Sequence, residues 1–223
     1  MPELGEEARA DQLDSAGSSM AEIIAEALAA AEPSPGLRWL DVGCGTGDLL
    51  RRVRDEHAPA SLGGLDLIDW LDEDLRGEVD FQAVGIEEAE GLPQADRVML
   101  VEVIEHLSSP WSALRKAAAL VAPGGRIVVS TPNIATLRTR LELAVRGNLT
   151  SFRPGYTPHM SPALPHVTAH VLEGEGFRID APRYAGADVI SLSGGRVWPP
   201  ALRARWPRLT SVSVVLAGAR PGS

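Results

Sequence analysis

The stretch Leu40-Asp41-Val42-Gly43-Cys44-Gly45-Thr46-Gly47 decides the fold class of this chain. Residues 39–42 predict a buried strand, and alternating glycines follow it. Glycines let the backbone turn sharply and approach a ligand where a Cβ would block it. Apolar residues at 49, 50 and 53 then begin a helical pattern. The stretch therefore predicts a strand, a glycine loop and a helix that bind a nucleotide.

The spacing of the glycines indicates which nucleotide binds. A dinucleotide fingerprint reads G-x-G-x-x-G and holds a pyrophosphate at the helix N-terminus. Here the glycines occupy every second position, and a carboxylate at Asp41 precedes them. That carboxylate would repel a pyrophosphate, but it can attract the ammonium group of an amino acid. S-adenosylmethionine carries such a group beside its adenosine, and no Gly-Lys-Ser/Thr follows that would indicate a phosphate loop.

A second acidic residue stands where a nucleotide site needs one. The run Leu62-Gly63-Gly64-Leu65-Asp66 predicts a short strand that ends in Asp66. An acidic residue roughly 20 positions beyond a glycine loop can accept hydrogen bonds from both ribose hydroxyls. Asp66 is therefore the second predicted cofactor residue.

Five motifs in this order resemble the class I S-adenosylmethionine-dependent methyltransferases, over about residues 37 to 180. The chain is similar to the bacterial small-molecule group that includes the ubiquinone-type O-methyltransferases. The motifs are the run 40–47, Gly64-Leu65-Asp66, Val101-Glu102-Val103-Ile104-Glu105-His106-Leu107, Val121-Ala122-Pro123-Gly124-Gly125-Arg126 and Ser130-Thr131-Pro132-Asn133.

This resemblance implies roles for individual cofactor-binding residues. Gly43, Cys44 and Gly45 would pack against the methionine part of S-adenosylmethionine. Asp66 would hold the ribose, and Leu67 would lie against the adenine. The backbone around Glu102 and Val103 would close the pocket beneath the sulfonium.

The adenine end departs from the family pattern. The family usually has an acidic residue after the third strand, but Gly85 stands at that position here. Ile86 can still flank the ring. Glu87 either supplies the missing acceptor for the adenine amino group or is a solvated residue at a helix start.

Strands and helices alternate along the chain, which predicts an α/β fold with a parallel sheet covered on both faces. The expected Rossmann-like sheet has seven strands, and the resemblance implies that the last strand is antiparallel. The predicted strands are 39–42, 62–66, 79–84, 96–101, 125–130, 177–184 and 211–217. The predicted helices are 20–31, 47–56, 70–75, 110–121, 137–145 and 163–175.

A chain of 223 residues that is 44% hydrophobic can bury the core of one domain. We expect residues 1–18 to lack fixed structure and residues 19–223 to form one methyltransferase domain. Residues 134–165 would be an insertion that recognises substrate above the carboxyl ends of the strands. The region 186–209 is expected either to form a homodimer surface or to edge the substrate pocket.

The sequence also bears on location and on the single cysteine. No apolar run is long enough to span a bilayer, and the acidic N-terminus does not resemble a signal peptide. A cytoplasmic protein without a membrane span is expected. Cys44 cannot form an internal disulfide, and we interpret it as a small residue that fits the loop rather than as a nucleophile.

Net charge bears on the partners. A formal charge of −9 argues against nucleic acid, because a phosphate backbone repels an acidic chain. A small-molecule acceptor, methylated on an oxygen or a nitrogen, is therefore expected. Arginines 138, 140, 146 and 153 form a local basic exception within the insertion. They either make a solvated helix face or pair with an anionic group of the substrate.

Methyl transfer is an in-line displacement at a sulfonium carbon, so the rate can come largely from holding the nucleophile in line. A histidine could remove the proton of a hydroxyl acceptor. His106 has the best position for this role, and His159 and His166 in or near the insertion are further candidates. His106 and His159 are the catalytic residues that we predict.

Two alternatives stay open at this stage. The pattern E-x-x-E-H at Glu102, Glu105 and His106 resembles part of the metal site of small-RNA 3′-terminal 2′-O-methyltransferases, with His159 as the downstream histidine. The charge and the missing histidine-aspartate signature argue against that reading, so no metal is expected. The second alternative is a non-catalytic S-adenosylmethionine-binding partner or sensor protein.

Overall fold

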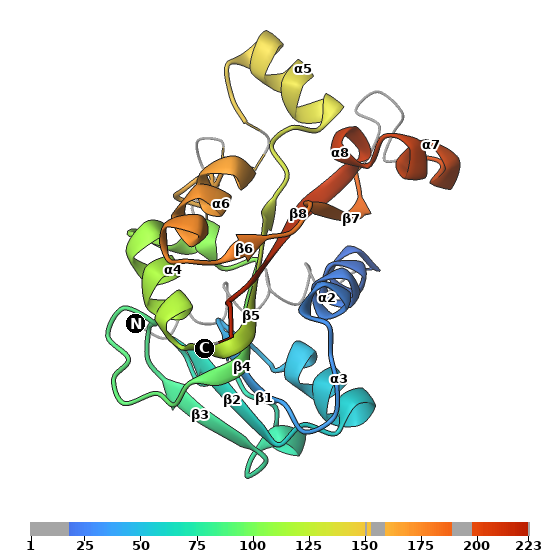
Figure 1. The fold of residues 1–223 in the computed structure, drawn as a ribbon. Coiled ribbons are helices and arrows are strands. Elements are labelled where there is room, and N and C mark those ends of the chain that lie inside the picture. Colours follow the sequence, from blue (N-terminus) through green and yellow to red (C-terminus); the bar gives the residue numbers. More distant parts are fainter. Residues whose placement is uncertain (1–17, 150, 153–158, 189–197, 223) are drawn as a thin grey trace.

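The computed structural model describes residues 18–149, 151–152, 159–188 and 198–222 (Figure 1). The N-terminal stretch expected to lack fixed structure lies outside these residues, apart from Ser18, where the first helix begins. Arg153, one of the candidate substrate-binding arginines, also lies outside them. The insertion predicted over 134–165 and the region 186–209 are each described in part.

Eight strands form one mixed sheet within the described residues. They are β1 (Arg38–Val42), β2 (Ser61–Asp66), β3 (Val79–Ala83), β4 (Ala95–Val101), β5 (Val121–Pro132), β6 (Arg178–Ile179), β7 (Arg183–Ala187) and β8 (Ser211–Ala219). The helices are α2 (Ser18–Ala31), α3 (Asp48–His57), α4 (Pro110–Ala119), α5 (Leu137–Arg146), α6 (Pro165–Gly174), α7 (Pro200–Arg205) and α8 (Pro207–Thr210), and the 3-10 turns are η1 (Glu73–Leu75) and η2 (Ile104–His106).

The strand order is β3-β2-β1-β4-β5-β8-β6, and β7 pairs with β8 beside β6. Strands β1 to β5 are parallel to one another. Strand β8 is antiparallel to β5, β6 and β7, which confirms the expected antiparallel last strand. The α/β, Rossmann-like fold class predicted from the alternation of elements is therefore confirmed.

Helices cover both faces of the sheet, as Figure 1 shows. Successive strand side chains point to opposite faces. In β1, Trp39 packs with residues of α2 and α3 in one buried cluster. Its neighbour Leu40 packs with residues of α4 and α6 in the other. The two apolar layers hold the sheet between them and fix the carboxyl ends of its strands.

Three elements differ clearly from the prediction. The helix predicted over 70–75 is only the 3-10 turn η1. The strand predicted over 177–184 is split into β6 and β7 around Pro182, which has no N–H to donate to a ladder. The sheet therefore has eight strands where seven were expected. Strand β5 begins at Val121 rather than at residue 125. A register shift lies between the pairs Ala95–Val121 and Arg97–Arg126, so the Pro-Gly-Gly stretch is a bulge within the strand.

Part of the predicted insertion forms helix α5, which stands away from the sheet in Figure 1. Thr136 caps it, because its side chain accepts a hydrogen bond from the Thr139 N–H. Within the described residues, no helix combines the length and the apolar character that crossing a bilayer requires.

Candidate functional site

The glycine loop and Asp66 join the carboxyl ends of β1 and β2. The N–H groups of Gly43 and Cys44 donate to the carbonyl of Leu65 at 2.7 and 3.0 Å. The Gly45 N–H then donates to one carboxylate oxygen of Asp66 at 2.9 Å, and the Ile68 N–H donates to the other at 3.3 Å. The two stretches predicted from the sequence are therefore in direct contact.

Gly43 is a position that only glycine fits. Its φ is +75°, a left-handed conformation that costs other residues energy. A Cβ on this residue would lie 2.5 Å from Cγ2 of Val103. The loop therefore approaches the segment that follows β4, and Gly43 and Val103 lie side by side.

Asp41 lies beneath this loop and is 3% exposed. Burial, together with the nearby charge of Asp66, raises the pKa of its carboxyl group to about 8. Burial also raises the pKa of the Cys44 thiol, with Asp41 and Asp66 acting in the same sense. A buried thiol that keeps its proton is a poor nucleophile, in keeping with the interpretation of Cys44 as a small loop residue.

The expected adenine end combines an exposed apolar side chain with an unexpected carboxylate. Leu67 is 73% exposed, whereas Ile86 is buried in the core. A Cβ at residue 85 would lie 2.6 Å from Oε2 of Glu88 and 3.2 Å from Cδ2 of Leu67. Glu88 therefore occupies the space that a side chain at position 85 would fill. The carbonyl of Glu87 accepts a hydrogen bond from Lys116 Nζ at 2.8 Å.

Glu102 points toward the antiparallel side of the sheet. Its φ is +55°, and its Oε1 accepts hydrogen bonds from Ser130 at 2.7 Å and Ser213 at 2.6 Å. The Glu102 N–H also donates to Ser130 Oγ at 2.9 Å. Burial raises the pKa of Glu102, and the two hydroxyl groups oppose that change. These contacts hold the left-handed turn that leads from β4 to Val103.

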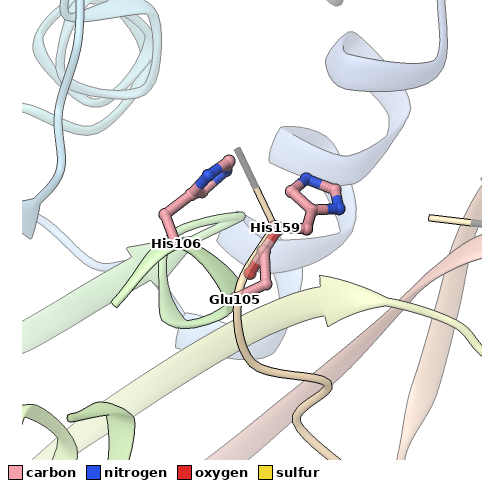
Figure 2. Close-up of side chains that lie close together, drawn as sticks. All are labelled: Glu105, His106 and His159. Carbon is pink, nitrogen blue, oxygen red and sulfur yellow. The ribbon is translucent and has the colours of Figure 1, made fainter. Parts of the chain in front are cut away.

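Glu105, His106 and His159 gather at one point (Figure 2). One potential ligand atom from each residue lies within 4.8 Å of the other two. The two imidazole rings have centroids 4.7 Å apart at an interplanar angle of 73°. Glu105 is fully buried, His159 is half-buried and His106 is exposed. The cluster therefore runs from the core outward to solvent.

The carboxylate of Glu105 is buried with few polar partners. Within the described residues, neither of its oxygens has a hydrogen bond of standard geometry, and the Thr131 hydroxyl is near enough to oppose the rise in its pKa. Burial raises the pKa of Glu105 well above its usual value, and the charge of Glu102 adds to that effect. Buried polar groups are nearly always satisfied, so this carboxylate is a candidate functional group. The sequence interpretation considered Glu105 only as part of a metal pattern.

Backbone hydrogen bonds bring His159 to this position. The carbonyl of Glu105 accepts hydrogen bonds from the N–H groups of Met160 at 2.8 Å and Ser161 at 3.0 Å. Ser161 Oγ donates to the carbonyl of Leu107 at 3.1 Å. The last part of the predicted insertion is thereby fixed against η2, and the two predicted catalytic histidines meet.

One contact orients the ring of His159. Its Nδ1 lies 2.9 Å from the carbonyl oxygen of Ser151, so Nδ1 carries the proton and donates it to that oxygen. Burial lowers the pKa of His159 to about 4, and His106 acts in the same direction. His159 is therefore neutral at pH 7.

A pocket of about 580 Å³ is lined by residues that come shortly after His106 and His159 in the sequence. They are Ser108, Ser109, Pro110, Trp111, Ser112, Met160, Ser161 and Pro162.

Two other candidate residues lie elsewhere. His166 is an exposed residue of α6. Arg138 of α5 pairs internally, with Glu142 at 3.2 Å and Asp188 at 4.0 Å. These contacts favour the interpretation of Arg138 as part of a helix face rather than as a substrate ligand.

Comparison with known proteins decides the family. A family described as "Methyltransferase domain" matches residues 13–180, which is well over half of the chain. The chain belongs to this methyltransferase family. The resemblance to class I S-adenosylmethionine-dependent methyltransferases is thereby confirmed, and the match spans the glycine loop, Asp66 and the His106 segment.

Curated relatives of this methyltransferase match less than half of the chain. The ubiquinone biosynthesis O-methyltransferase of Bordetella avium is 38% identical over 109 residues, which cover 44% of each chain. The methyltransferase thus matches less than half the length of this curated relative.

Solved structures confirm the fold. A SAM-dependent methyltransferase from Archaeoglobus fulgidus gives a TM-score of 0.62 at 18% identity, covering 88% of this chain and 91% of that one. The 1,6-didemethyltoxoflavin-N1-methyltransferase of Burkholderia thailandensis, with bound S-adenosylhomocysteine, gives a TM-score of 0.64 at 15% identity. That match covers 98% of this chain and 85% of the other.

Proposed function

We propose that this methyltransferase moves the methyl group of S-adenosylmethionine to an oxygen of a small-molecule acceptor. The observation that carries the proposal is the carboxylate of Asp66, held by the N–H groups of Gly45 and Ile68 at the joined ends of β1 and β2. Transfer to oxygen is supported by the ubiquinone biosynthesis O-methyltransferases among the relatives. A cytoplasmic location and a homodimer stay predictions.

The cofactor would extend along the loop with its sulfonium toward β4. The carboxylate of Asp41 attracts the ammonium group, and the loop residues Gly43, Cys44 and Gly45 pack on the methionine chain. Asp66 accepts hydrogen bonds from the ribose hydroxyls. Leu67 stacks on the adenine, and this role is supported by its 73% exposure, since a large apolar side chain gains by being covered. The backbone of Glu102 and Val103 closes the pocket, and Ile86 supports it from the core.

We expect Glu88, rather than Glu87, to accept the adenine amino group, because its carboxylate lies beside Gly85 and Leu67. Glu88→Gln should weaken S-adenosylmethionine binding about tenfold, the effect of losing one charge-assisted hydrogen bond. The control is Glu90→Gln, which changes an exposed glutamate two residues away and should bind normally. Calorimetry with S-adenosylmethionine measures both. Equal affinities in the two variants would contradict the assignment.

The acceptor would occupy the pocket lined by residues 108–112 and 160–162. It would present its reacting oxygen to His106 and His159. These histidines assist the loss of the hydroxyl proton as the oxygen attacks the methyl group. The neutral state of His159 supports this role, because Nε2 keeps its lone pair at pH 7.

The pH dependence of cofactor binding tests the role of Asp41. Its pKa of about 8 in the free protein means that the carboxyl group holds a proton at neutral pH. Pairing with an ammonium group requires the charged carboxylate, so binding releases that proton and strengthens as pH rises. Affinity should increase by up to about tenfold per unit between about pH 6 and about pH 7.5, where an α-ammonium group keeps its charge.

The measurement is calorimetry in two buffers that differ in ionisation enthalpy, which reports proton release directly. Asp41→Asn should remove both the slope and the proton release. An affinity in the native protein that does not change over this range would contradict the role of Asp41. Absence of any S-adenosylmethionine binding would reject the proposed function as a whole.

The two alternative functions predict other outcomes. A non-catalytic partner or sensor would bind the cofactor but methylate no phenol or other hydroxyl acceptor. A metal-dependent RNA methyltransferase gains support from the cluster of Glu105, His106 and His159, but the charge of −9 opposes RNA binding. Methylation of a short RNA, and not of small hydroxyl compounds, would favour that alternative.

A further inference from the structure

We propose that Arg51 of α3 is a positioning residue for S-adenosylmethionine, because its ion pairs fix residues 66–75 against the glycine loop. These residues form the cofactor arm, which begins with Asp66 and Leu67 and so carries the proposed ribose and adenine contacts. The fixing of the arm is a property of the chain itself, whereas its effect on cofactor affinity rests on the proposed function.

The start of the cofactor arm has little apolar anchoring. Leu67 is 73% exposed, and the next residue, Ile68, is 42% exposed. Further along the arm, the Asp72 N–H donates to the Thr46 carbonyl of the glycine loop at 3.2 Å. A single hydrogen bond of this kind contributes little net stability. The position of Leu67 therefore depends on how firmly the rest of the arm is held.

The far end of the cofactor arm packs on the last glycine of the loop. Leu71 and Leu75 are buried. A Cβ on Gly47 would lie 2.3 Å from Cδ1 of Leu75 and 3.0 Å from Cδ1 of Leu71. The arm therefore meets the loop where α3 begins, and Arg51 lies one turn into that helix.

Arg51 contacts the loop with its backbone and the arm with its side chain. Its N–H donates to the Gly47 carbonyl at 2.8 Å. Its guanidinium donates to Asp72 at 2.8 Å and to the two carboxylate oxygens of Asp74 at 2.9 and 3.0 Å. Asp48 of α3 accepts a further hydrogen bond at 2.8 Å and orients the group. The planar guanidinium of arginine suits such a bidentate contact better than a lysine ammonium does.

The charges of these ion pairs persist at neutral pH. The hydrogen bond from Arg51 is the main cause that lowers the pKa of Asp74 to about 2, and the same bond raises the pKa of Arg51. Arg54 reaches Asp74 as well, at its carbonyl at 2.9 Å and at its Oδ2 at 3.3 Å. Salt, rather than pH, should therefore control how strongly the arm is held.

An arm that is held in place before binding loses less conformational freedom when the cofactor binds. An exposed ion pair changes an equilibrium constant by up to about fivefold. Arg51 makes one such pair with each of two carboxylates of the arm, Asp72 and Asp74. Loss of both pairs should therefore weaken cofactor binding by about 5-fold to 20-fold.

Calorimetry with S-adenosylhomocysteine tests the role of Arg51, because that compound has no net charge and its own binding should depend little on salt. Arg51→Met, which keeps the apolar stem, should bind about 5-fold to 20-fold more weakly than the native chain at low salt. At about 1 M salt, where the Debye length is about 3 Å, the difference should shrink to about twofold. Arg51→Lys should restore part of the affinity.

Arg52→Met is the matched control. It changes the next residue of α3, which pairs with Glu56 of the same helix at 3.3 Å, and it should bind S-adenosylhomocysteine normally. Hydrogen exchange of the backbone gives a readout that needs no cofactor. The amides of the cofactor arm should exchange faster in Arg51→Met, while those of β4 and β5 keep their native rates and show that the variant folds.

The outcomes separate this proposal from the proposed function. Native affinity together with native exchange in Arg51→Met would overturn the role of Arg51. A weakened affinity that salt does not change and that lysine does not restore would overturn it too, since lost packing would then be the cause. If the native chain binds no S-adenosylhomocysteine, the proposed function is rejected, and faster exchange of the arm in Arg51→Met would still support its fixing by Arg51.

Discussion

Replacement of Gly43 by alanine should lower the affinity for S-adenosylmethionine by at least about 100-fold, the effect that a displacement of about 1 Å can have near a reacting centre. The residue has φ +75°, and a Cβ would lie 2.5 Å from Cγ2 and 3.1 Å from Cγ1 of Val103. The loop or the segment after β4 must then move, and both line the proposed cofactor pocket. Calorimetry with S-adenosylmethionine measures the change.

A matched control separates this contact from the cost of the backbone conformation. Gly36 has φ +77° and nothing within 4 Å of its ideal Cβ, and it lies before β1 rather than after it. Gly36→Ala should cost about 1 kcal/mol of stability for the left-handed conformation alone. Gly43→Ala should cost a further 1–3 kcal/mol or so for the overlap. Equal stabilities and equal cofactor affinities in the two variants would show that Val103 yields without disturbing the loop.

The cofactor side of the site could be predicted because its signals are local. Glycines at alternate positions require a close backbone approach, and an acidic residue at a strand end requires only the strand that precedes it. Asp41, Gly43 and Asp66 follow from such patterns. Their contact follows in turn from the parallel pairing of β1 and β2, which the alternation of elements predicts.

The acceptor side could be predicted only in part. His106 follows a predicted strand, but its meeting with His159 depends on N–H groups of Met160 and Ser161 that bond to the Glu105 carbonyl. Every residue except proline has such an N–H, so the sequence carries no signal for this contact. The burial of the Glu105 carboxylate is likewise a property of packing.

Glu88 and the split of β6 from β7 illustrate two other limits. Glu88 approaches Gly85 because position 85 lacks a side chain. The family pattern asks for an acidic residue at that one position, so it does not predict that the neighbouring Glu88 places its carboxylate there. Pro182 stood within the predicted strand 177–184, and its missing N–H was a signal that could have divided that strand. The first limit concerns three-dimensional contact, and the second concerns an available rule.

Asp66→Asn should reduce the affinity for S-adenosylmethionine by about 100-fold to 1,000-fold, equivalent to about 3–4 kcal/mol. The native carboxylate already accepts hydrogen bonds from the Gly45 and Ile68 N–H groups, and its remaining lone pairs are available to the ribose. An asparagine of the same size has one acceptor oxygen, and its amide NH₂ would face an N–H donor. The loop and the ribose would therefore compete for a single oxygen.

Asp69→Asn is the control, because Asp69 is exposed and lies three residues further along the chain, where it pairs with Arg76. Its cofactor affinity should stay within about twofold of native, as expected for a surface ion pair.

A cofactor analogue without the ribose 2′-hydroxyl distinguishes the two roles of Asp66. If the carboxylate holds the ribose, the analogue binds the native protein more weakly than S-adenosylhomocysteine does, and Asp66→Asn no longer discriminates between the two. Discrimination that survives the substitution would mean that Asp66 orders the glycine loop but does not contact the ribose.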